Sequence, residues 1–385
     1  MNILFITAVP LEYSSSANFR NTALIKGLLD SGHSVSTLST KPQEGSECFD
    51  KTILNLKLNK RYFVELSALH KGINETNNNN FKLKIKKQLY KIYTAFNLYD
   101  SRKNEAGKVS KIDFSSQRFD LIISSSDPKS SHLFAHELIK SNPQIAKRWI
   151  QYWGDPFTGD INKRSKVPSF LISKEEKRLI SLCDKAVFVS PLTTEYIKNK
   201  YPEYKEKIRF VPIGYSQEKI YPEHKSNTLD LCYCGDYNQK DRNLLPLFEA
   251  VSELENKCRL TVAGNSDLKP VLKDNVTVFP RVEKQKVEEI ERDSDVIVCV
   301  CNRKGTQIPG KIYHASATNR TVLIILDGEH KNEIEKYFKA YGRFAFCENE
   351  KNAILKTLKN LSKDKKEEIP CKAFNSLNIA KEILK

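Results

Sequence analysis

The feature that most constrains the fold of this chain is the alternation of short apolar runs with helix-like segments. An apolar run at 2–7 is followed by a segment, 20–31, in which leucine and isoleucine recur at helical spacing until Gly32. A second apolar run, 34–38, begins soon after that glycine. Strand, helix and strand in this order form a βαβ unit, which implies a parallel sheet with a right-handed crossover.

The same order returns along the rest of the chain. Further strands are expected at 119–123, 149–152, 185–189, 207–211, 230–234, 259–262, 276–279, 296–301 and 321–326, with helical segments between them. The alternation is broken at 212–226, which we interpret as a linker. We therefore predict an α/β protein of two Rossmann-like, doubly wound domains, 1–211 and 227–370, that face a central cleft. A C-terminal helix, 371–385, is expected to pack back on the first domain.

Composition limits the kind of protein that this fold belongs to. The 385 residues suffice for two cores, and a hydrophobic content of 39% excludes general disorder. The longest apolar runs have about six residues, whereas a membrane-spanning helix needs about 20. The first residues lack the basic leader and cleavage site of a secretory signal, so we interpret 2–7 as a strand. The nine cysteines form no CxxC pair, and Cys232/Cys234 and Cys299/Cys301 have strand spacing, which is typical of buried thiols in a reducing cytoplasm.

The chain is basic, with 63 Lys and Arg against 47 Asp and Glu and a formal charge of +16. This balance favours an acidic partner: nucleic acid, anionic lipid or a phosphorylated ligand. The excess is concentrated at 51–110, which holds 13 basic and 4 acidic residues. Within it, 81–98 has the pattern of a basic amphipathic helix, which either packs on the first sheet or binds an anionic membrane surface. No base-reading motif accompanies the charge, so no nucleic-acid partner is expected.

Sequence motifs of common cofactor sites are missing. Neither GxGxxG nor GxxxxGK[ST] occurs, which argues against a dinucleotide dehydrogenase and a P-loop NTPase. His132 and His136 have the spacing of two zinc ligands, but no third ligand follows at a recognised spacing. Asp293 and Asp295 form a DxD pair that lies between a helix and an apolar strand, where a helix end explains it better than a metal site. We expect neither a metal nor another cofactor.

Two loops that follow strands of the second domain have the features of an anion site. The first, 305–314, is rich in glycine and proline and presents backbone N–H groups and Lys311 at the start of a short helix. The second, 234–243, places Lys240 and Arg242 after another strand. Together the loops are able to clamp a diphosphate without a metal. The alternatives are an ordinary strand-to-helix connection for the first loop and a solvated surface loop for the second.

The order of these segments resembles that of a GT-B glycosyltransferase, most of all glycosyltransferase family 4, over nearly the whole chain. The resemblance rests on the stretches 2–7, 20–40, 183–190, 211–214 and 308–325. The family carries an E-x7-E signature in its second domain, and this sequence has Thr306 and His314 at those positions. The glycine-rich turn that the family has after its first strand is replaced by three serines, Ser14, Ser15 and Ser16.

The resemblance implies a retaining, metal-independent transfer of a sugar from a nucleotide-sugar donor, held by the second domain, to an acceptor held by the first. Donor contacts are expected from Gly235, Lys240, Arg242, Gly305, Thr306, Gln307, Pro309, Gly310, Lys311 and His314. Acceptor contacts are expected from Ser14, Ser15, Ser16, Arg20, Asp127 and Asp155. Lys311, with Arg242 or Lys240, would stabilise the charge on the departing diphosphate. Asp155 would orient the acceptor hydroxyl; the alternative for it is the cap of a turn.

The expected enzyme builds a bacterial surface polysaccharide, such as lipopolysaccharide or capsule, or a glycolipid, on a saccharide or lipid-linked acceptor. We expect it in the cytoplasm, at the inner membrane face if 81–98 binds lipid. Two alternatives stay open. One is a GT-B epimerase of nucleotide sugars, which needs no acceptor. The other is a catalytically degenerate GT-B module that binds a nucleotide sugar or a polyanion, because both signature carboxylates are missing.

Overall fold

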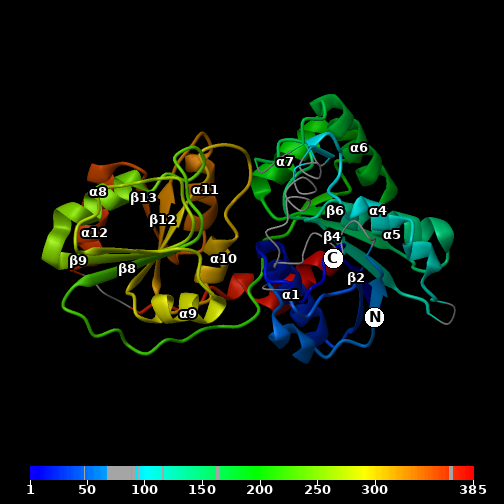
Figure 1. The fold of residues 1–385 in the computed structure, drawn as a ribbon, viewed down its shortest axis with the longest axis horizontal. Coiled ribbons are helices and arrows are strands. Elements are labelled where there is room, and N and C mark those ends of the chain that lie inside the picture. Colours follow the sequence, from blue (N-terminus) through cyan, green and yellow to red (C-terminus); the bar gives the residue numbers. More distant parts are fainter. Residues whose placement is uncertain are drawn as a thin grey trace. The chain divides into compact units, whose positions relative to one another are not determined.

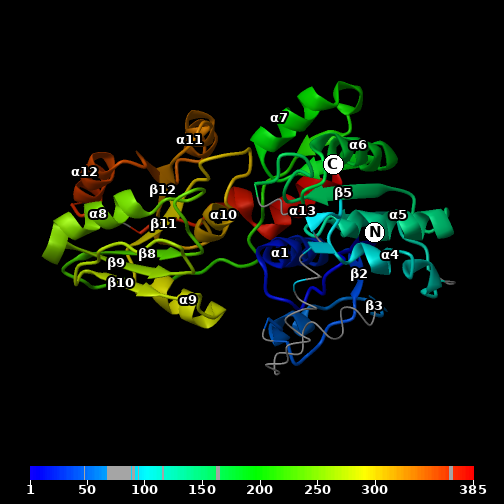
Figure 2. The same ribbon diagram turned by 45° about the horizontal axis from the view of Figure 1, so that its top comes forward.

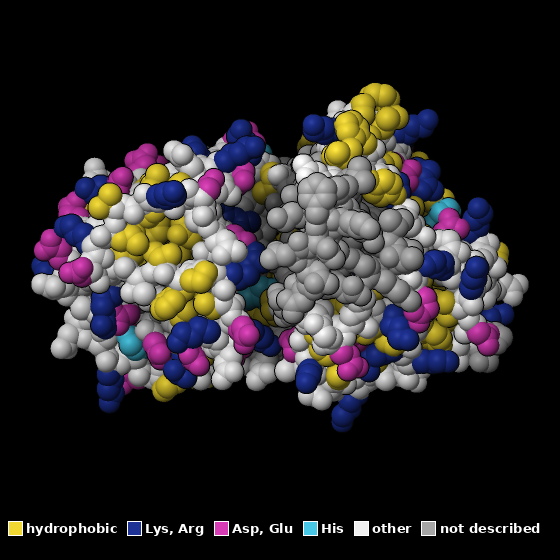
Figure 3. All heavy atoms as spheres, viewed as in Figure 1, with side chains coloured by type: hydrophobic (Ala, Val, Ile, Leu, Met, Phe, Trp, Pro, Cys, Tyr) yellow, Lys and Arg dark blue, Asp and Glu magenta, His cyan; other side chains and the backbone are white. Residues whose placement is uncertain are grey.

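The computed structural model describes residues 1–385 except 47, 67–87, 89–91, 94, 115–116, 162–164 and 364–366. Most of the basic segment 81–98, with all of its lysines, lies outside the described residues. Within the described part of the chain, no helix combines the length and hydrophobicity needed to cross a bilayer. Figure 3 shows one face, on whose described surface Lys and Arg side chains lie among those of Asp and Glu.

The chain divides into two compact units (Figure 1). The first comprises Met1–Ser216 together with Ser376–Lys385, and the second comprises Gln217–Asn375. The division falls inside the segment expected as a linker. Residues beyond it already pair with the second unit, since the backbone N–H of Tyr221 donates to Asn319 Oδ1 at 2.9 Å.

The first unit is built on a parallel sheet. Its strands are β1 (Asn2–Ile6), β2 (Ser34–Thr40), β3 (Arg61–Val64), β4 (Leu121–Ser125), β5 (Trp149–Trp153), β6 (Lys185–Phe188) and β7 (Ile208–Phe210). They lie in the order β3-β2-β1-β4-β5-β6-β7, with every neighbouring pair parallel. β3 is a short edge strand that the sequence pattern did not predict.

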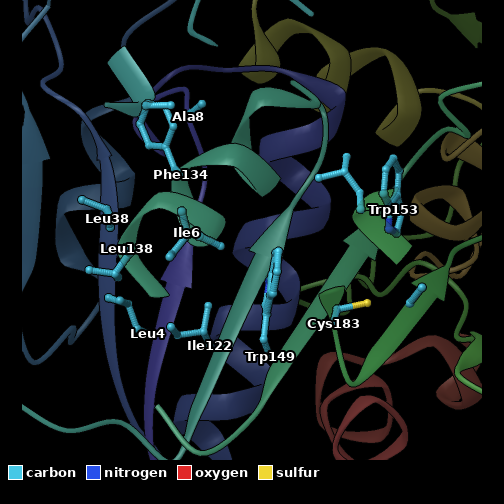
Figure 4. Close-up of a cluster of buried hydrophobic side chains, with 14 of the residues drawn as sticks. Leu4, Ile6, Ala8, Leu38, Ile122, Phe134, Leu138, Trp149, Trp153 and Cys183 are labelled. Carbon is cyan, nitrogen blue, oxygen red and sulfur yellow. The ribbon is translucent and has the colours of Figure 1, made fainter. Parts of the chain in front are cut away.

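The helices of the first unit pack on a sheet whose central strands are apolar. They are α1 (Ser16–Asp30), α4 (Lys103–Ala106), α5 (Ser130–Ser141), α6 (Ser169–Leu182), α7 (Pro191–Lys200) and α13 (Ser376–Leu384). Figure 4 shows side chains of the sheet, such as Leu4 and Ile6 of β1, in one buried cluster with Phe134 and Leu138 of α5. Every residue of β4 is buried, as is usual for parallel strands covered on both faces.

The C-terminal helix α13 packs against α1, beside which Figures 1 and 2 show it. The contact is close at Gly27, where a Cβ atom would lie 1.9 Å from the carbonyl oxygen of Ser376. Glycine therefore allows the backbones of the two helices to touch. The residues directly before α13 belong to the second unit, and the backbone N–H of Cys371 donates to Ser316 O at 2.8 Å.

The second unit repeats the architecture. Its strands are β8 (Leu229–Cys234), β9 (Cys258–Ala263), β10 (Val276–Phe279), β11 (Val296–Val300), β12 (Thr321–Leu326) and β13 (Phe344–Glu348). All neighbouring pairs are parallel, in the order β10-β9-β8-β11-β12-β13. The helices are α8 (Leu245–Leu254), α9 (Lys284–Arg292), α10 (Lys311–Ala315), α11 (Lys331–Lys339) and α12 (Lys351–Leu361). All nine cysteines are free thiols; Cys232, Cys299 and Cys301 are buried, and Cys234 is half-buried.

Both units are doubly wound, which confirms the predicted α/β fold class. The strand order reverses between β1 and β4 in the first sheet and between β8 and β11 in the second. Loops that follow the strands on either side of such a switch point run in opposite directions, which leaves room for a ligand at the carboxyl edge of the sheet. The loops after these strands are therefore the places where a site is expected in each unit.

Candidate functional site

The loops after β8 and β11 bring two cationic side chains together at the switch point of the second sheet. Arg242 lies in the loop between β8 and α8, and Lys311 is the first residue of α10. Arg242 Nε donates to Asn302 Oδ1 at 2.8 Å. The Lys311 ammonium lies 5.8 Å from the centre of the Tyr233 ring, in a cation–π contact. Burial raises the pKa of Tyr233 to about 12, and the charge of Arg242 acts against that rise, which places both cations close to this ring.

Gly235 makes room for Lys311. A Cβ atom at position 235 would lie 2.0 Å from Lys311 Nζ, far inside contact distance. A second glycine, Gly264, directly follows the neighbouring strand β9 and makes room for the backbone of Gly235. A Cβ atom on Gly264 would lie 2.0 Å from the carbonyl oxygen of Gly235. The glycine that directly follows β8 is therefore required by the close approach of a lysine from the neighbouring loop.

The two cations are not neutralised by the protein. Within the described residues, neither Arg242 nor Lys311 forms an ion pair with a carboxylate. Desolvation lowers the pKa of Lys311, and the neighbouring charge of Arg242 lowers it too, while the thiols of Cys234 and Cys299 and the more distant carboxylate of Asp236 act in the opposite direction. Since two like charges held side by side repel, an anion between them would be stabilised by both.

The remaining donor residues predicted from the sequence lie in the same two loops and in α10. Lys240 is exposed on the loop of Arg242. Gly305 has a φ of +76°, which favours glycine, and Thr306, Gln307, Pro309 and Gly310 continue the loop that ends at Lys311. His314 lies three residues beyond Lys311 in α10, a helix of five residues whose dipole adds little to the charge of the two cations. Sequence analysis did not predict Asn302 as a site residue. Its position just after the carboxyl end of β11 is a signal that could have found it.

The first unit carries a second polar cluster at its own switch point. Asp127 follows β4, and Asp155 and Asp160 follow β5; one carboxylate oxygen of each lies within 4.8 Å of the others. The ammonium of Lys129 pairs with Asp127, and with Asp160 at 3.0 Å. These carboxylates have donor atoms that suit a metal ion, but a lysine of the chain already supplies positive charge to two of them. Lys129 and Asp160 were missed by sequence analysis, although both lie in the loops that carry the predicted residues.

Asp155 is the carboxyl group of this cluster whose pKa is strongly shifted. Desolvation raises its pKa from 3.8 to about 7, and the negative charges of Asp127 and Asp160 contribute. The positive charges of Lys129 and Arg20 oppose the rise. A carboxyl group that titrates near neutral pH is suited to accept a proton from a hydroxyl group.

Glu176 holds the loop that carries Asp155. Its side chain is fully buried in α6, and its Oε1 accepts hydrogen bonds from the backbone N–H groups of Phe157 and Thr158, at 2.7 and 3.0 Å. Its Oε2 accepts a hydrogen bond from the Tyr201 hydroxyl at 2.9 Å. These contacts fix the backbone two residues beyond Asp155, so that the position of Asp155 does not depend on its own partners alone.

Arg20 is buried beside the cluster. Its Nη2 donates to the carbonyl oxygen of Ser126, and its guanidinium carbon lies 5.1 Å from the centre of the Tyr152 ring. A Cβ on Gly154 would lie 1.9 Å from Arg20 Nη1, so glycine leaves the room that the guanidinium occupies. Arg20 therefore braces the backbone next to Asp127 from within.

The three serines predicted for the acceptor are exposed at the start of α1. Ser15 caps this helix, because its Oγ accepts a hydrogen bond from the backbone N–H of Asn18 at 3.1 Å. The helix therefore begins at Ser16 rather than at the expected position 20. Ser14 lies just before the cap. Its backbone N–H donates to the carbonyl oxygen of Cys48 at 2.7 Å, and no contact described for Ser14 reaches the aspartate cluster.

The other metal-compatible residues have structural partners. His132 is buried, its Nδ1 lies 2.8 Å from Ser124 Oγ, and burial lowers its pKa well below the usual range, so the ring is neutral. Asp293 ends α9 and pairs with Arg292 of the same helix. Asp295 instead accepts a hydrogen bond from the backbone N–H of Asp230 at 2.8 Å, near the amino ends of the strands. Together with His224 and Asp230, Asp295 offers donor atoms for a cation, at the sheet edge opposite to Arg242.

Comparisons with known proteins identify the fold and no family. No protein-family model matches the sequence, and no curated protein sequence matches it. Solved structures do match: TarM, with a TM-score of 0.60 and 8% identity, covers 99% of this chain and is itself covered over 94%. HepE of Anabaena in complex with UDP and glucose has a TM-score of 0.56 and 10% identity, with 100% of this chain and 94% of that chain covered. A UDP-N-acetylglucosamine 2-epimerase has a TM-score of 0.52 and 11% identity, with 100% and 93% covered.

These likenesses extend over both units, and together with the two doubly wound sheets they define a GT-B fold. At such low identities they show the architecture alone. The chain is thus a GT-B protein with a cationic site after β8 and β11 and an aspartate–lysine cluster after β4 and β5.

Proposed function

We propose that this protein is a glycosyltransferase that moves a sugar from a nucleotide-sugar donor to a saccharide or lipid-linked acceptor, as a member of glycosyltransferase family 4 or close to it. The observation that carries the proposal is the convergence of Arg242 and Lys311, unpaired with any described carboxylate, at the switch point of the second sheet. Two positive charges held together in this way are suited to bind the negatively charged diphosphate of a nucleotide sugar. Two proteins with this fold are HepE, solved in complex with UDP and glucose, and a UDP-N-acetylglucosamine 2-epimerase, which supports a nucleotide sugar here.

In the donor half, Arg242 and Lys311 bind the diphosphate, and Gly235 leaves the room that the Lys311 side chain occupies. The leaving nucleoside diphosphate gains negative charge as the bond to the sugar breaks, so cations fixed beside it stabilise the transition state more than the ground state. His314, at the position of the later signature glutamate, is the candidate partner for the ribose. Thr306 offers a hydroxyl group where the family has the earlier glutamate. The charge stabilisation argued here comes from Arg242 and Lys311, so it needs neither signature carboxylate.

In the acceptor half, Asp155 accepts a hydrogen bond from the acceptor hydroxyl and orients it. A pKa of about 7 allows the carboxyl group to be ionised in a large share of molecules at neutral pH. Lys129 keeps Asp127 and Asp160 paired, so the cluster carries less net negative charge than three free aspartates would. We propose transfer with retention and without a metal, in the synthesis of a bacterial surface polysaccharide or glycolipid in the cytoplasm. The basic segment 81–98 is proposed to contact the anionic membrane there.

A screen of nucleotide sugars and nucleoside diphosphates for thermal stabilisation tests the donor half. A ligand at about 100 times its dissociation constant should add roughly 2.7 kcal/mol to the free energy of unfolding. Each charge-assisted contact is worth about 1.5 to 3 kcal/mol, so Arg242→Ala and Lys311→Ala should each weaken binding about tenfold or more. Lys286→Ala is the control, because Lys286 is an exposed residue of α9 that pairs with Glu289. Unchanged affinity in both site variants would remove the donor site from this place.

The reaction is then tested by measuring diphosphate release from the identified donor, with and without candidate acceptors. Release that depends on an acceptor supports transfer. Conversion of the donor into its epimer would show the alternative enzyme class, which shares this fold. Tight binding with no turnover in any mixture would show a module that binds nucleotide sugars without catalysis.

A further inference from the structure

Asn302 connects the two halves of the cationic site. It follows β11 by two residues, and its side chain is 6% exposed. Its Oδ1 accepts a hydrogen bond from Arg242 Nε at 2.8 Å, and its Nδ2 donates to the carbonyl oxygen of Gln307 at 2.9 Å. One amide group therefore holds both the guanidinium and the backbone of the loop that leads to Lys311.

An amide is the side chain that performs this task without neutralising the site. Asparagine offers a donor and an acceptor at once, so both contacts are satisfied by one buried group. Aspartate would accept from Arg242 more strongly, but it would cancel the positive charge and would have no N–H for Gln307 O. An aliphatic residue would leave the buried carbonyl oxygen and the guanidinium without these partners.

The Asn302 amide is one of two side-chain groups that hold the guanidinium of Arg242. Asn302 accepts from Arg242 Nε at 2.8 Å, and Tyr233 forms a second side-chain hydrogen bond with Arg242. The backbone of the loop is held by the pairing of Asn238 with Arg242, at 3.0 and 3.1 Å, and by the backbone N–H of Arg303, which donates to Asp241 O at 2.9 Å. The backbone pairing fixes the Cα atom of Arg242. It leaves the direction of the long side chain to Asn302 and Tyr233.

We propose that Asn302 is a positioning residue for diphosphate binding, which aims Arg242 and fixes the loop before Lys311 while leaving their positive charge uncompensated. The inference rests on the proposed donor site and adds the group that organises it. Losing the amide releases a flexible side chain and a loop that must then be ordered again when the ligand binds, which weakens binding without removing a ligand contact.

The test measures the dissociation constant of UDP for the full chain, together with inorganic pyrophosphate as a base-independent competitor. UDP is replaced by the nucleoside diphosphate that binds best if the screen finds another base. Asn302→Ala should weaken binding about fivefold or more. Asn302→Asp should weaken it further and reduce the dependence of binding on salt, because the new carboxylate neutralises Arg242.

Asn275→Ala is the matched control for the loss of a side-chain amide. Asn275 directly precedes β10, so it lies at the amino ends of the strands, whereas Asn302 lies at their carboxyl ends. Its Nδ2 donates to the carbonyl oxygens of Val251, Glu255 and Cys258. This variant should lower the melting temperature and leave UDP affinity unchanged. A double-mutant cycle then asks whether Asn302 acts through Arg242: in the Arg242→Ala background, Asn302→Ala should cost less than half of what it costs in the wild type.

The outcomes separate this inference from the function on which it rests. If the wild type binds no nucleoside diphosphate and no pyrophosphate, the donor site and the role of Asn302 are both overturned. If Arg242→Ala weakens binding and Asn302→Ala does not, the donor site stands and the role of Asn302 is overturned. Equal costs of Asn302→Ala in both backgrounds would also overturn it, because the amide would then act independently of Arg242.

Discussion

Replacing Asp155 by asparagine should stabilise the first unit at pH 8 and change it little at pH 4. Desolvation and the charges of Asp127 and Asp160 raise the pKa of Asp155 from 3.8 to about 7 in the folded protein. Between these values the folded state binds the proton more tightly than the unfolded state does. Stability is therefore lost as the pH rises through this window, and the whole cost is present above pH 7. Asparagine has a similar shape and never ionises, so it removes that cost.

The magnitude follows from the two pKa values. At ~1.36 kcal/mol for each pKa unit, a rise from 3.8 to about 7 corresponds to an upper bound of ~4 kcal/mol. Because the Asp155 residue is partly exposed, solvent screens its charge, and we expect about half of this, roughly 2 kcal/mol. For a unit of this size that is a rise in melting temperature of about 4 to 8 °C.

The assay is thermal unfolding of the wild type and the Asp155→Asn variant at pH 4 and pH 8, with the transition of the first unit followed separately if the units unfold in two steps. Asp230→Asn is the control of opposite sign. Although burial acts to raise it, hydrogen bonds from Arg259 and His224 hold the pKa of Asp230 well below its usual range, so its loss should destabilise the protein at pH 8. An Asp155→Asn variant no more stable than the wild type at pH 8, or equally changed at both pH values, would refute the reasoning.

Three further predictions concern the proposed chemistry. Turnover of the identified donor should continue in excess EDTA, because cations of the chain stand where a metal would otherwise act; a complete loss that added Mg²⁺ or Mn²⁺ reverses would contradict this. Gly235→Ala should lower UDP affinity about tenfold at an unchanged melting temperature, since the new Cβ overlaps only the flexible end of Lys311; unchanged affinity would argue against Lys311 as a ligand. Anionic vesicles should bind the protein in a salt-sensitive way, at about 1 kcal/mol for each lysine near the surface, and equal binding to neutral vesicles would refute it. Binding should disappear when five lysines are changed to glutamine together: Lys82, Lys84, Lys86, Lys87 and Lys91.

Local patterns in the sequence were sufficient for the fold class and for the loops of the site, but not for the edge strands β3 and β13. A strand buried on both faces, such as β4 or β11, is a continuous apolar run, and a helix that covers it has period 3.6, so the βαβ order is visible without tertiary information. Since ligands of such sheets bind after the strands, the same order led to Gly235, Arg242 and Lys311, which the structure brings together. The short edge strand β3 was not visible, because half of its residues are only partly buried and its pattern is weak.

Tertiary structure alone decided how the site residues act on one another. Lys129 pairs with Asp160 across 31 positions of the sequence, and Arg242 meets Asn302 across 60. The pKa of Asp155 depends on the water removed around it and on charges that come largely from distant parts of the sequence: Asp127 and Lys129 after β4, and Arg20 of α1. A sequence shows which side chains follow a strand. Desolvation and the distances between charges, which set their chemistry, exist only after the strands have paired.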